Sequence, residues 1–212
     1  MRVFLSAVAA AIILVPGAAS AAAPSDGSAL REGAVPRDGS LVSAEALPAA
    51  LRLAGAGDAW RLSYRTRSWT GRSTVVTGTL TVPAGPVPAG GWRVVSFGHG
   101  ANGVGDACAE SVSGPGPTER VLLEGLVAAG YAVAVTDFEG IGTPADSPFV
   151  DGRSEAHDMV DIVHAARALA PLSRSFASVG YSLGGHAALF TSALAERYAP
   201  DLHLVGTIAL AP

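Results

Sequence analysis

A serine flanked by glycines has the clearest chemical potential in this 212-residue chain: Gly180-Tyr181-Ser182-Leu183-Gly184. A serine hydroxyl is a weak nucleophile and needs a neighbouring base and an orienting group. The pattern G-x-S-x-G places such a serine on a strained turn between a strand and a helix, the nucleophile elbow. Gly180 and Gly184 leave room where that turn brings backbone against backbone. We therefore predict that Ser182 is a catalytic nucleophile.

The residues around the pentapeptide support this interpretation. By itself the pattern is weak, because the chain has 26 glycines and also contains many serines. Here an apolar strand is expected over residues 176–179 and a helix with apolar positions from residue 183 to about residue 198. A glycine- and serine-rich loop before an amphipathic helix is the alternative. Strand, turn and helix together favour the elbow.

A second glycine-rich segment, Phe97-Gly98-His99-Gly100-Ala101-Asn102-Gly103, follows an expected strand. Ester hydrolysis builds negative charge on the carbonyl oxygen, which two preorganised backbone N–H groups must meet. In this kind of site one donor follows the nucleophile and the other belongs to a loop after an earlier strand. We predict Leu183 and Ala101 as these donors, with Gly100 allowing the loop to approach substrate. His99 precedes the serine, so we expect it to form structural hydrogen bonds rather than to act as the base.

The other histidines have no expected catalytic role. His157 and His164 lie seven residues apart on one expected helix, and no carboxylates or cysteines are arranged as ligands beside them, so we predict no metal and no cofactor. His186 comes four residues after Ser182 on the same helix, and its side chain should not face the serine. His203 begins a strand, and we expect it far from the elbow.

The acidic residues considered for the site are expected to be structural. Asp137 follows a buried strand at the functional edge of a parallel sheet, and we expect it to order the loop at residues 138–144. Asp146, Asp151 and Asp158 are interpreted as charges in loops and at the start of a helix.

Hydrophobic periodicity predicts alternating strands and helices in one domain over residues 42–212. The expected helices cover residues 43–53, 118–129, 154–169 and 183–198, and the expected strands cover residues 60–64, 73–82, 92–97, 131–136, 176–179 and 203–210. The first two strands form an antiparallel hairpin, and the later strands, apolar on both faces, form a parallel sheet covered by helices. This order is typical of an α/β-hydrolase.

The first residues have the pattern of a secretory signal peptide. Arg2 precedes an apolar run at residues 3–15, and Ala19-Ser20-Ala21 is a small-residue cleavage site, so we assign residues 1–21 to the signal. A buried N-terminal helix is the alternative. Residues 22–41, rich in Pro, Gly and Ser, are expected to be a flexible mature N-terminus. We therefore expect a secreted protein with no stable membrane insertion after cleavage.

The net charge and the cysteine content limit the classes of partner that we expect. The formal net charge is −4, which argues against nucleic acid or an anionic membrane as the main partner. Cys108 is the only cysteine, and in an exported protein it has a free thiol, an intermolecular bridge or a partner outside the chain. The oligomeric state stays open.

Several segments in order resemble the secretory lipase family, exported triacylglycerol lipases and esterases of the α/β-hydrolase superfamily. The resemblance runs from about residue 60 to the end, and its strongest segments are residues 98–108, 136–144, 152–155, 180–190 and 209–212. It implies that Ser182 attacks a small-molecule or lipid ester and forms an acyl-enzyme. In that family the acid, the histidine and a cap that shapes the acyl pocket lie on later segments.

Because the sequence ends at Pro212, we expect an N-terminal part of such an enzyme. Its α/β-hydrolase fold would be truncated after the strand that follows the nucleophile helix, without the acid and the histidine. Two alternatives remain open: an acyltransferase or peptidase with the same elbow, or a catalytically inactive hydrolase-fold fragment.

Overall fold

A seven-stranded sheet organises residues 37–212, the part of the chain that the computed structural model describes. The strands are β1 (Leu41–Ala46), β2 (Ala56–Arg67), β3 (Ser73–Pro83), β4 (Trp92–Gly98), β5 (Tyr131–Thr136), β6 (Leu172–Tyr181) and β7 (His203–Leu210). They lie in the order β1-β2-β3-β5-β4-β6-β7. Strands β4 to β7 are mutually parallel where they pair, and β1, β2 and β3 are antiparallel to their neighbours. The predicted α/β fold, a mostly parallel sheet entered through an antiparallel hairpin, is confirmed.

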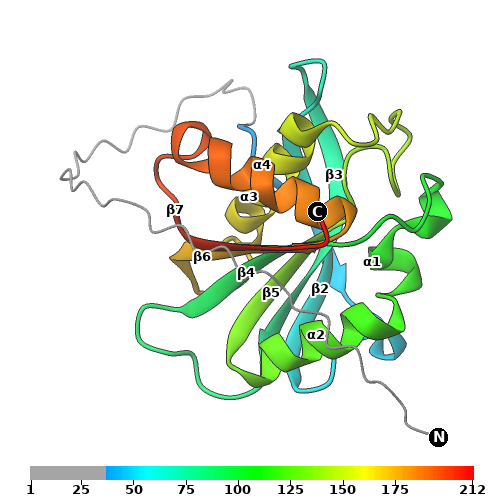
Figure 1. Cartoon of the computed structure of the whole chain (residues 1–212). Coiled ribbons are helices and arrows are strands. Elements are labelled where there is room, and N and C mark those ends of the chain that lie inside the picture. The colour runs from blue at the N-terminus through cyan, green and yellow to red at the C-terminus, as the bar shows by residue number, and fades with distance from the viewer. Residues whose placement is uncertain (1–36) are drawn as a thin grey trace, which may run out of the picture.

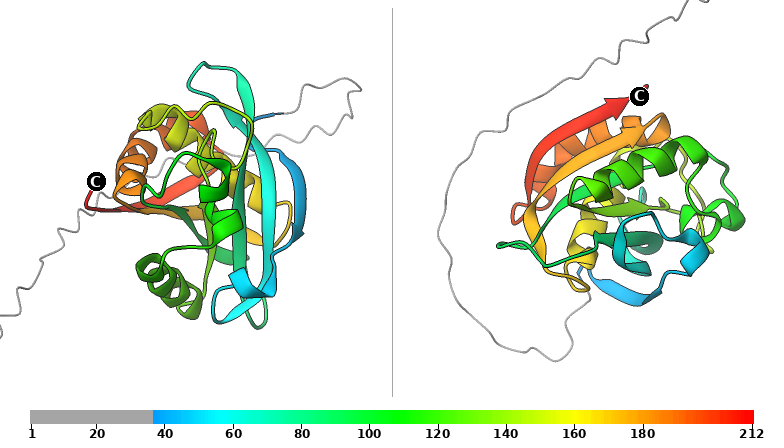
Figure 2. Two further views of the ribbon diagram at one scale, coloured as in Figure 1. Left: turned by 90° about the vertical axis from the view of Figure 1, so that its right-hand side faces the viewer. Right: turned by 90° about the horizontal axis from the view of Figure 1, so that it is seen from below.

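Helices cover both faces of this sheet (Figures 1 and 2). The α-helices are α1 (Glu110–Ser113), α2 (Pro117–Ala128), α3 (Gly152–Ala166) and α4 (Leu183–Tyr198), and short 3-10 turns occur at η1 (Ala49–Leu51) and η2 (Asp106–Cys108). Helices α3 and α4 lie side by side on one face, and α2 lies on the other. Within residues 37–212, no helix combines the length and apolar character needed to cross a bilayer.

The central strands are apolar on both faces because each face packs on a helical layer. Ala132 and Ala134 of β5 belong to the core cluster that contains residues of α3 and α4. The alternating residues Val133 and Val135 belong to the cluster that contains Leu123 of α2. This alternation is the period of two expected for a strand. It explains why the sequence shows a continuous apolar run there.

The first strand corrects one prediction. Residues 43–53 were expected to form a helix, with Ser43 as its N-cap, but β1 occupies Leu41–Ala46 and pairs antiparallel with β2. Its residues are mostly exposed, as befits an edge strand. Alanine, leucine and glutamate favour a helix locally, and strand pairing overrides this weak preference.

The remaining expected elements are confirmed, with shifts at their ends. β5 has the predicted bounds, while β6 begins four residues before the predicted start at residue 176. Helix α3 starts two residues earlier than predicted, because Asp151 caps it by accepting from Ser154 N at 2.9 Å. The predicted signal peptide and most of the predicted flexible segment at residues 22–41 lie outside the described residues, and Leu41 already belongs to β1.

A buried tyrosine ties the hairpin to the parallel part of the sheet. Tyr64 of β2 is fully buried, and its hydroxyl lies 2.7 Å from Thr136 Oγ1 of β5. The same hydroxyl donates to the Asp158 carbonyl oxygen of α3 at 3.1 Å. A hydrogen bond between buried groups leaves an uncompensated partner when one side is removed.

Tyr64→Phe is expected to lower the free energy of unfolding by about 1–3 kcal/mol, because the Thr136 hydroxyl and the Asp158 carbonyl lose a buried partner. Tyr131→Phe is the control. Tyr131 is half-buried, and the Arg93 Cζ atom lies 4.4 Å from the centre of its ring, a contact that phenylalanine keeps. Urea denaturation of the three proteins measures the difference. Equal stability of Tyr64→Phe and the wild type would contradict this role.

Candidate active site

Ser182 occupies a strained turn between strand and helix. It directly follows Tyr181, the last residue of β6, and precedes Leu183, the first residue of α4. Its backbone angles are φ 52° and ψ −116°, a region that residues with a Cβ rarely adopt. The geometry is that of the predicted elbow, in which strain projects the serine from the carboxyl edge of the sheet.

Three glycines permit this turn. A Cβ on Gly180 would overlap the carbonyl group of Gly184, and a Cβ on Gly184 would overlap the carbonyl group of Gly98. A Cβ on Gly98 would lie 2.8 Å from the Gly184 Cα atom. The backbones of β4, β6 and α4 therefore meet where a side chain has no room. Gly180 and Gly184 have the role that the sequence predicted, and Gly98 joins them.

Backbone hydrogen bonds hold the elbow on both sides. Ser182 N donates to Leu210 O of β7 at 2.9 Å, and Gly184 N donates to His99 O at 3.0 Å. The first N–H groups of a helix have no acceptor within it. The Gly184 N–H has an external acceptor, whereas the Leu183 N–H, directly after Ser182, has no acceptor among the backbone hydrogen bonds of residues 37–212. The predicted role of Leu183 as an oxyanion donor stays a prediction, with this geometry in its favour.

The loop after β4 is held by two polar contacts. Gly100 N donates to Glu119 Oε1 of α2 at 2.7 Å. The Gly100 carbonyl oxygen lies 2.7 Å from Nδ1 of His99, whose ring is buried and lies against Phe138. His99 therefore makes the structural hydrogen bond expected of it. Ala101, the predicted second donor, is exposed beside these anchored residues, and its role stays a prediction.

Gly100 is also needed for packing. A Cβ at this position would lie 3.0 Å from Cδ1 of Tyr181, the residue before the nucleophile. The loop therefore lies directly against the elbow.

Asp137 is structural, as predicted, but it anchors a different segment. Its carboxylate accepts from Thr77 Oγ1 at 2.6 Å and from Ser111 N at 2.9 Å. It therefore ties α1, at the end of the loop that follows β4, to β3. The expected ordering of residues 138–144 by this side chain is replaced by this contact, which depends on the packing of α1 over the sheet.

Two further residues were considered from the sequence, His203 and Asp158, and the prediction for Asp158 is wrong. His203 begins β7 and pairs with Ser175, at the end of the strands opposite the elbow. Asp158 was expected to be a charge at the start of a helix, but it lies in the middle of α3, fully buried, and accepts from Glu139 N at 2.8 Å. Burial raises the pKa of Asp158 well above its ordinary value.

His186 points to a partner on the neighbouring helix. Its Nδ1 lies 2.7 Å from Glu155 Oε2 of α3. Burial raises the pKa of Glu155, and the histidine opposes that rise. The chain has five histidines, all within residues 37–212, and no hydrogen bond in this range joins one of them to the Ser182 hydroxyl. Within the described residues, Ser182 thus lies at the elbow with no histidine bound to its hydroxyl.

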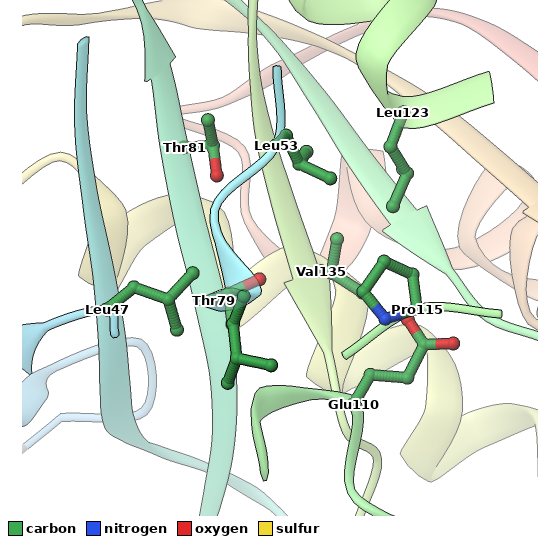
Figure 3. Close-up of a pocket in the computed structure, with 9 residues that line it drawn as sticks. Leu47, Leu53, Thr79, Thr81, Glu110, Pro115, Leu123 and Val135 are labelled. Carbon is green, nitrogen blue, oxygen red and sulfur yellow. The ribbon is translucent and has the colours of Figure 1, made fainter. Parts of the chain in front are cut away.

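Sequence reasoning missed two carboxyl groups beside the loop after β4. Glu110 begins α1 and is buried, and its Oε atoms have no hydrogen-bond partner within residues 37–212. It lines a cavity of about 20 Å³ together with leucines of the segment between β1 and β2, two threonines of β3, Val135 of β5 and Leu123 of α2 (Figure 3). Burial, and then the neighbouring Glu119 carboxyl group, raise the pKa of Glu110 to about 9. No local pattern marks these residues, because their environment is created by the packing of α1 and α2.

The sheet order and the strained serine between β6 and α4 define an α/β-hydrolase fold. The family model described as secretory lipase matches residues 116–212. The X-ray structure of Candida antarctica lipase A is similar, with a TM-score of 0.68 and 25% identity, over 81% of this chain and 41% of that chain.

Curated relatives agree with this match. Lipase 7 of Candida albicans is 27% identical over 162 residues, which cover 70% of this chain and 36% of that protein. A protein of Mycobacterium tuberculosis named probable inactive lipase MT1628 is 25% identical over 163 residues, covering 73% of this chain and 36% of that protein. The chain thus spans 36% of the length of each of these relatives. These matches place residues 116–212 in the secretory lipase family.

Gly184→Ala is expected to lower the free energy of unfolding by about 3 kcal/mol or more, because the new methyl group meets the Gly98 carbonyl group rather than a movable side chain. Gly125→Ala is the matched control. It lies inside α2 with no atom within 4 Å of an added Cβ, so it should stabilise the protein by about 0.5–1 kcal/mol. Thermal and urea unfolding compare the two. A tolerated alanine at position 184 would contradict the close backbone contact.

Glu110→Gln is expected to stabilise the protein increasingly as the pH rises from about 5 to 9. In this range the folded wild type keeps a proton that the unfolded chain releases near its ordinary pKa of 4.5, so its stability falls with pH. The limiting slope for one such group is about 1.4 kcal/mol per pH unit. Glutamine removes this dependence, and near pH 4 the two proteins should have similar stability.

Urea denaturation at several pH values measures this difference. Glu196→Gln, on the exposed side of α4, serves as the control and should follow the wild type at every pH. A constant difference between Glu110→Gln and the wild type across the range would contradict a neutral, buried Glu110.

Proposed function

We propose that Ser182 is the nucleophile of a secreted carboxylic ester hydrolase of the triacylglycerol lipase type. The observation that carries the proposal is the backbone of Ser182, held at φ 52° between β6 and α4 by the glycine contacts beneath it. A strained conformation of this kind at the carboxyl edge of a sheet is a feature of functional sites. Membership of the secretory lipase family supports both the ester substrate and an extracellular location.

The chemistry follows from these groups. Ser182 Oγ forms a bond to the ester carbonyl carbon, the π electrons move to the carbonyl oxygen, and the serine proton passes to a base. Collapse of this intermediate breaks the bond to the leaving alcohol, which takes up that proton. Water then attacks the acyl-enzyme in the same way and releases the carboxylic acid. In both intermediates the Leu183 and Ala101 N–H groups stabilise the negative oxygen.

In our proposal, the acid and the histidine of this mechanism come from a segment outside the 212 residues of this sequence. Two observations support this. Within residues 37–212 no histidine is hydrogen bonded to Ser182, and the chain spans 36% of the length of the first curated relative. A base from another segment would approach at the carboxyl edge, where Tyr181 is 47% exposed beside the serine.

A catalytically inactive member of the fold is the second candidate function. The same lack of a histidine at Ser182 within residues 37–212 favours it, and so does similarity to a protein named as a probable inactive lipase. The two proposals differ in one outcome: turnover of an ester, dependent on Ser182, by a protein that also includes the segment supplying the acid and the histidine. An acyltransferase or a peptidase is separated from a hydrolase by assaying p-nitrophenyl esters, with and without an acceptor alcohol, alongside peptide amides.

In a protein that includes the segment supplying the acid and the histidine, Ser182→Ala is expected to abolish labelling by a fluorophosphonate probe and to lower ester turnover by at least about 10³-fold, because the attacking oxygen is removed. Ser192→Ala is the control: this exposed serine of α4 donates to Leu189 O at 2.7 Å and has no place at the elbow. Gel fluorescence and p-nitrophenyl ester hydrolysis provide the measurements. Labelling that persists in Ser182→Ala at the wild-type level would exclude Ser182 as the nucleophile.

A further inference from the structure

Glu119 stands out among the polar side chains near the elbow because it holds the backbone of the loop that approaches substrate. Its Oε1 accepts from Gly100 N at 2.7 Å, across nineteen positions of sequence. Within residues 37–212 no basic side chain forms an ion pair with Glu119, whose neighbours are this backbone N–H and the buried carboxyl group of Glu110. A bond from an N–H group to a carboxylate is stronger than one between neutral groups.

The start of α2 holds this carboxyl group in place. Glu119 lies in the first turn of α2, where the unpaired N–H groups favour a negative charge. A Cβ on Gly116, the N-cap, would lie 3.8 Å from Glu119 Oε2, so the carboxyl group extends from the helix terminus to the loop. Leu123, one turn further along α2, is buried in the core and fixes the helix against the sheet. The position of Gly100 is therefore tied to the core through α2.

The contact determines which loop N–H remains for substrate. The His99 carbonyl oxygen accepts from Gly184 N at 3.0 Å, and the Gly100 carbonyl oxygen lies 2.7 Å from Nδ1 of His99. With the Gly100 N–H bound to Glu119, both the N–H and the carbonyl group of Gly100 have a partner. The next N–H along the chain is that of Ala101, on an exposed part of the loop.

We propose that Glu119 is a positioning residue of the oxyanion hole: by binding Gly100 N–H it orients the Ala101 N–H toward the oxygen of the ester. This inference rests on the proposed function, because Ser182 must be the nucleophile for the oxyanion to form there. Glu119 does not touch substrate. It acts through the backbone that it holds.

The test compares three variants of the protein: Glu119→Ala, Glu119→Gln and Glu124→Ala. Glutamine retains an oxygen that accepts from Gly100 N–H, whereas alanine does not. Glu124 is a matched control on the same helix, because its Oε1 accepts from another backbone group, Ala54 N, at 3.1 Å. Glu124 lies away from the loop that follows β4, at the contact of α2 with the residues before β2.

The first measurement is amide hydrogen exchange by NMR, which does not depend on activity. Glu119→Ala is expected to lower the protection of the Gly100 amide by about tenfold or more, while Glu119→Gln keeps most of it. Glu124→Ala should lower protection at Ala54 and leave Gly100 unchanged. Unchanged protection of Gly100 in Glu119→Ala would overturn the inference, whatever the activity.

The second measurement is the hydrolysis of a p-nitrophenyl ester by the protein that includes the segment supplying the acid and the histidine. Glu119→Ala should lower kcat about 10- to 100-fold with KM within about twofold, since the donor is displaced rather than removed. Glu119→Gln should restore most of kcat, and Glu124→Ala should keep it. An equal kcat in Glu119→Ala and Glu124→Ala would show that the contact only stabilises the fold and would overturn the positioning role.

Failure of the proposed function has a different result. In that case the wild type shows no turnover that depends on Ser182, so the positioning role in catalysis is excluded together with the mechanism. Amide exchange then still decides whether Glu119 holds Gly100.

Discussion

The contact of three backbones at Gly98, Gly180 and Gly184 is the constraint on which the elbow depends. Strands β4 and β6 are neighbours in the sheet, and α4 begins directly above their carboxyl ends. A Cβ at Gly180 or Gly184 would overlap a carbonyl group, and backbone cannot move aside as a flexible side chain can. This contact brings Gly184 N to the His99 carbonyl oxygen and leaves the Leu183 N–H at the helix terminus. Ser182 and the Leu183 N–H are thus positioned by the same packing.

Carboxyl groups hold the neighbouring loop from several elements. Glu119 of α2 binds the start of the loop, and Asp137, directly after β5, binds Ser111 at the start of α1. Glu110 lies between these groups, buried and with a raised pKa. One consequence is that acidic side chains close to the site organise backbone N–H groups rather than act on substrate. A second is that Glu110, neutral because burial raises its pKa, limits the negative charge beside Glu119 and Asp137.

Many elements were predictable from sequence because their signals are local. The apolar run of β5, the proline that follows α3 and the glycines of the elbow each act within a few residues. The prediction of a helix at residues 43–53 is wrong because it relied on local preference alone. Alanine, leucine and glutamate favour a helix there, but β1 pairs with β2, and Ala44 lies opposite Leu62. A distant partner decided the conformation of a segment whose local preference was weak.

The sequence by itself determined the position of the elbow and of its serine, because the G-x-S-x-G turn depends on residues that are adjacent in the chain. The strand, the turn and the helix around Ser182 need no distant contact to be recognised. Only the tertiary structure decided the roles of Glu119, Glu110 and Asp158. Their hydrogen bonds and raised pKa values arise where α1, α2 and α3 bury polar groups against the sheet. Burial and long-range partners determine the pKa and the hydrogen bonds of a carboxyl group, and neither can be inferred from its neighbours in the sequence.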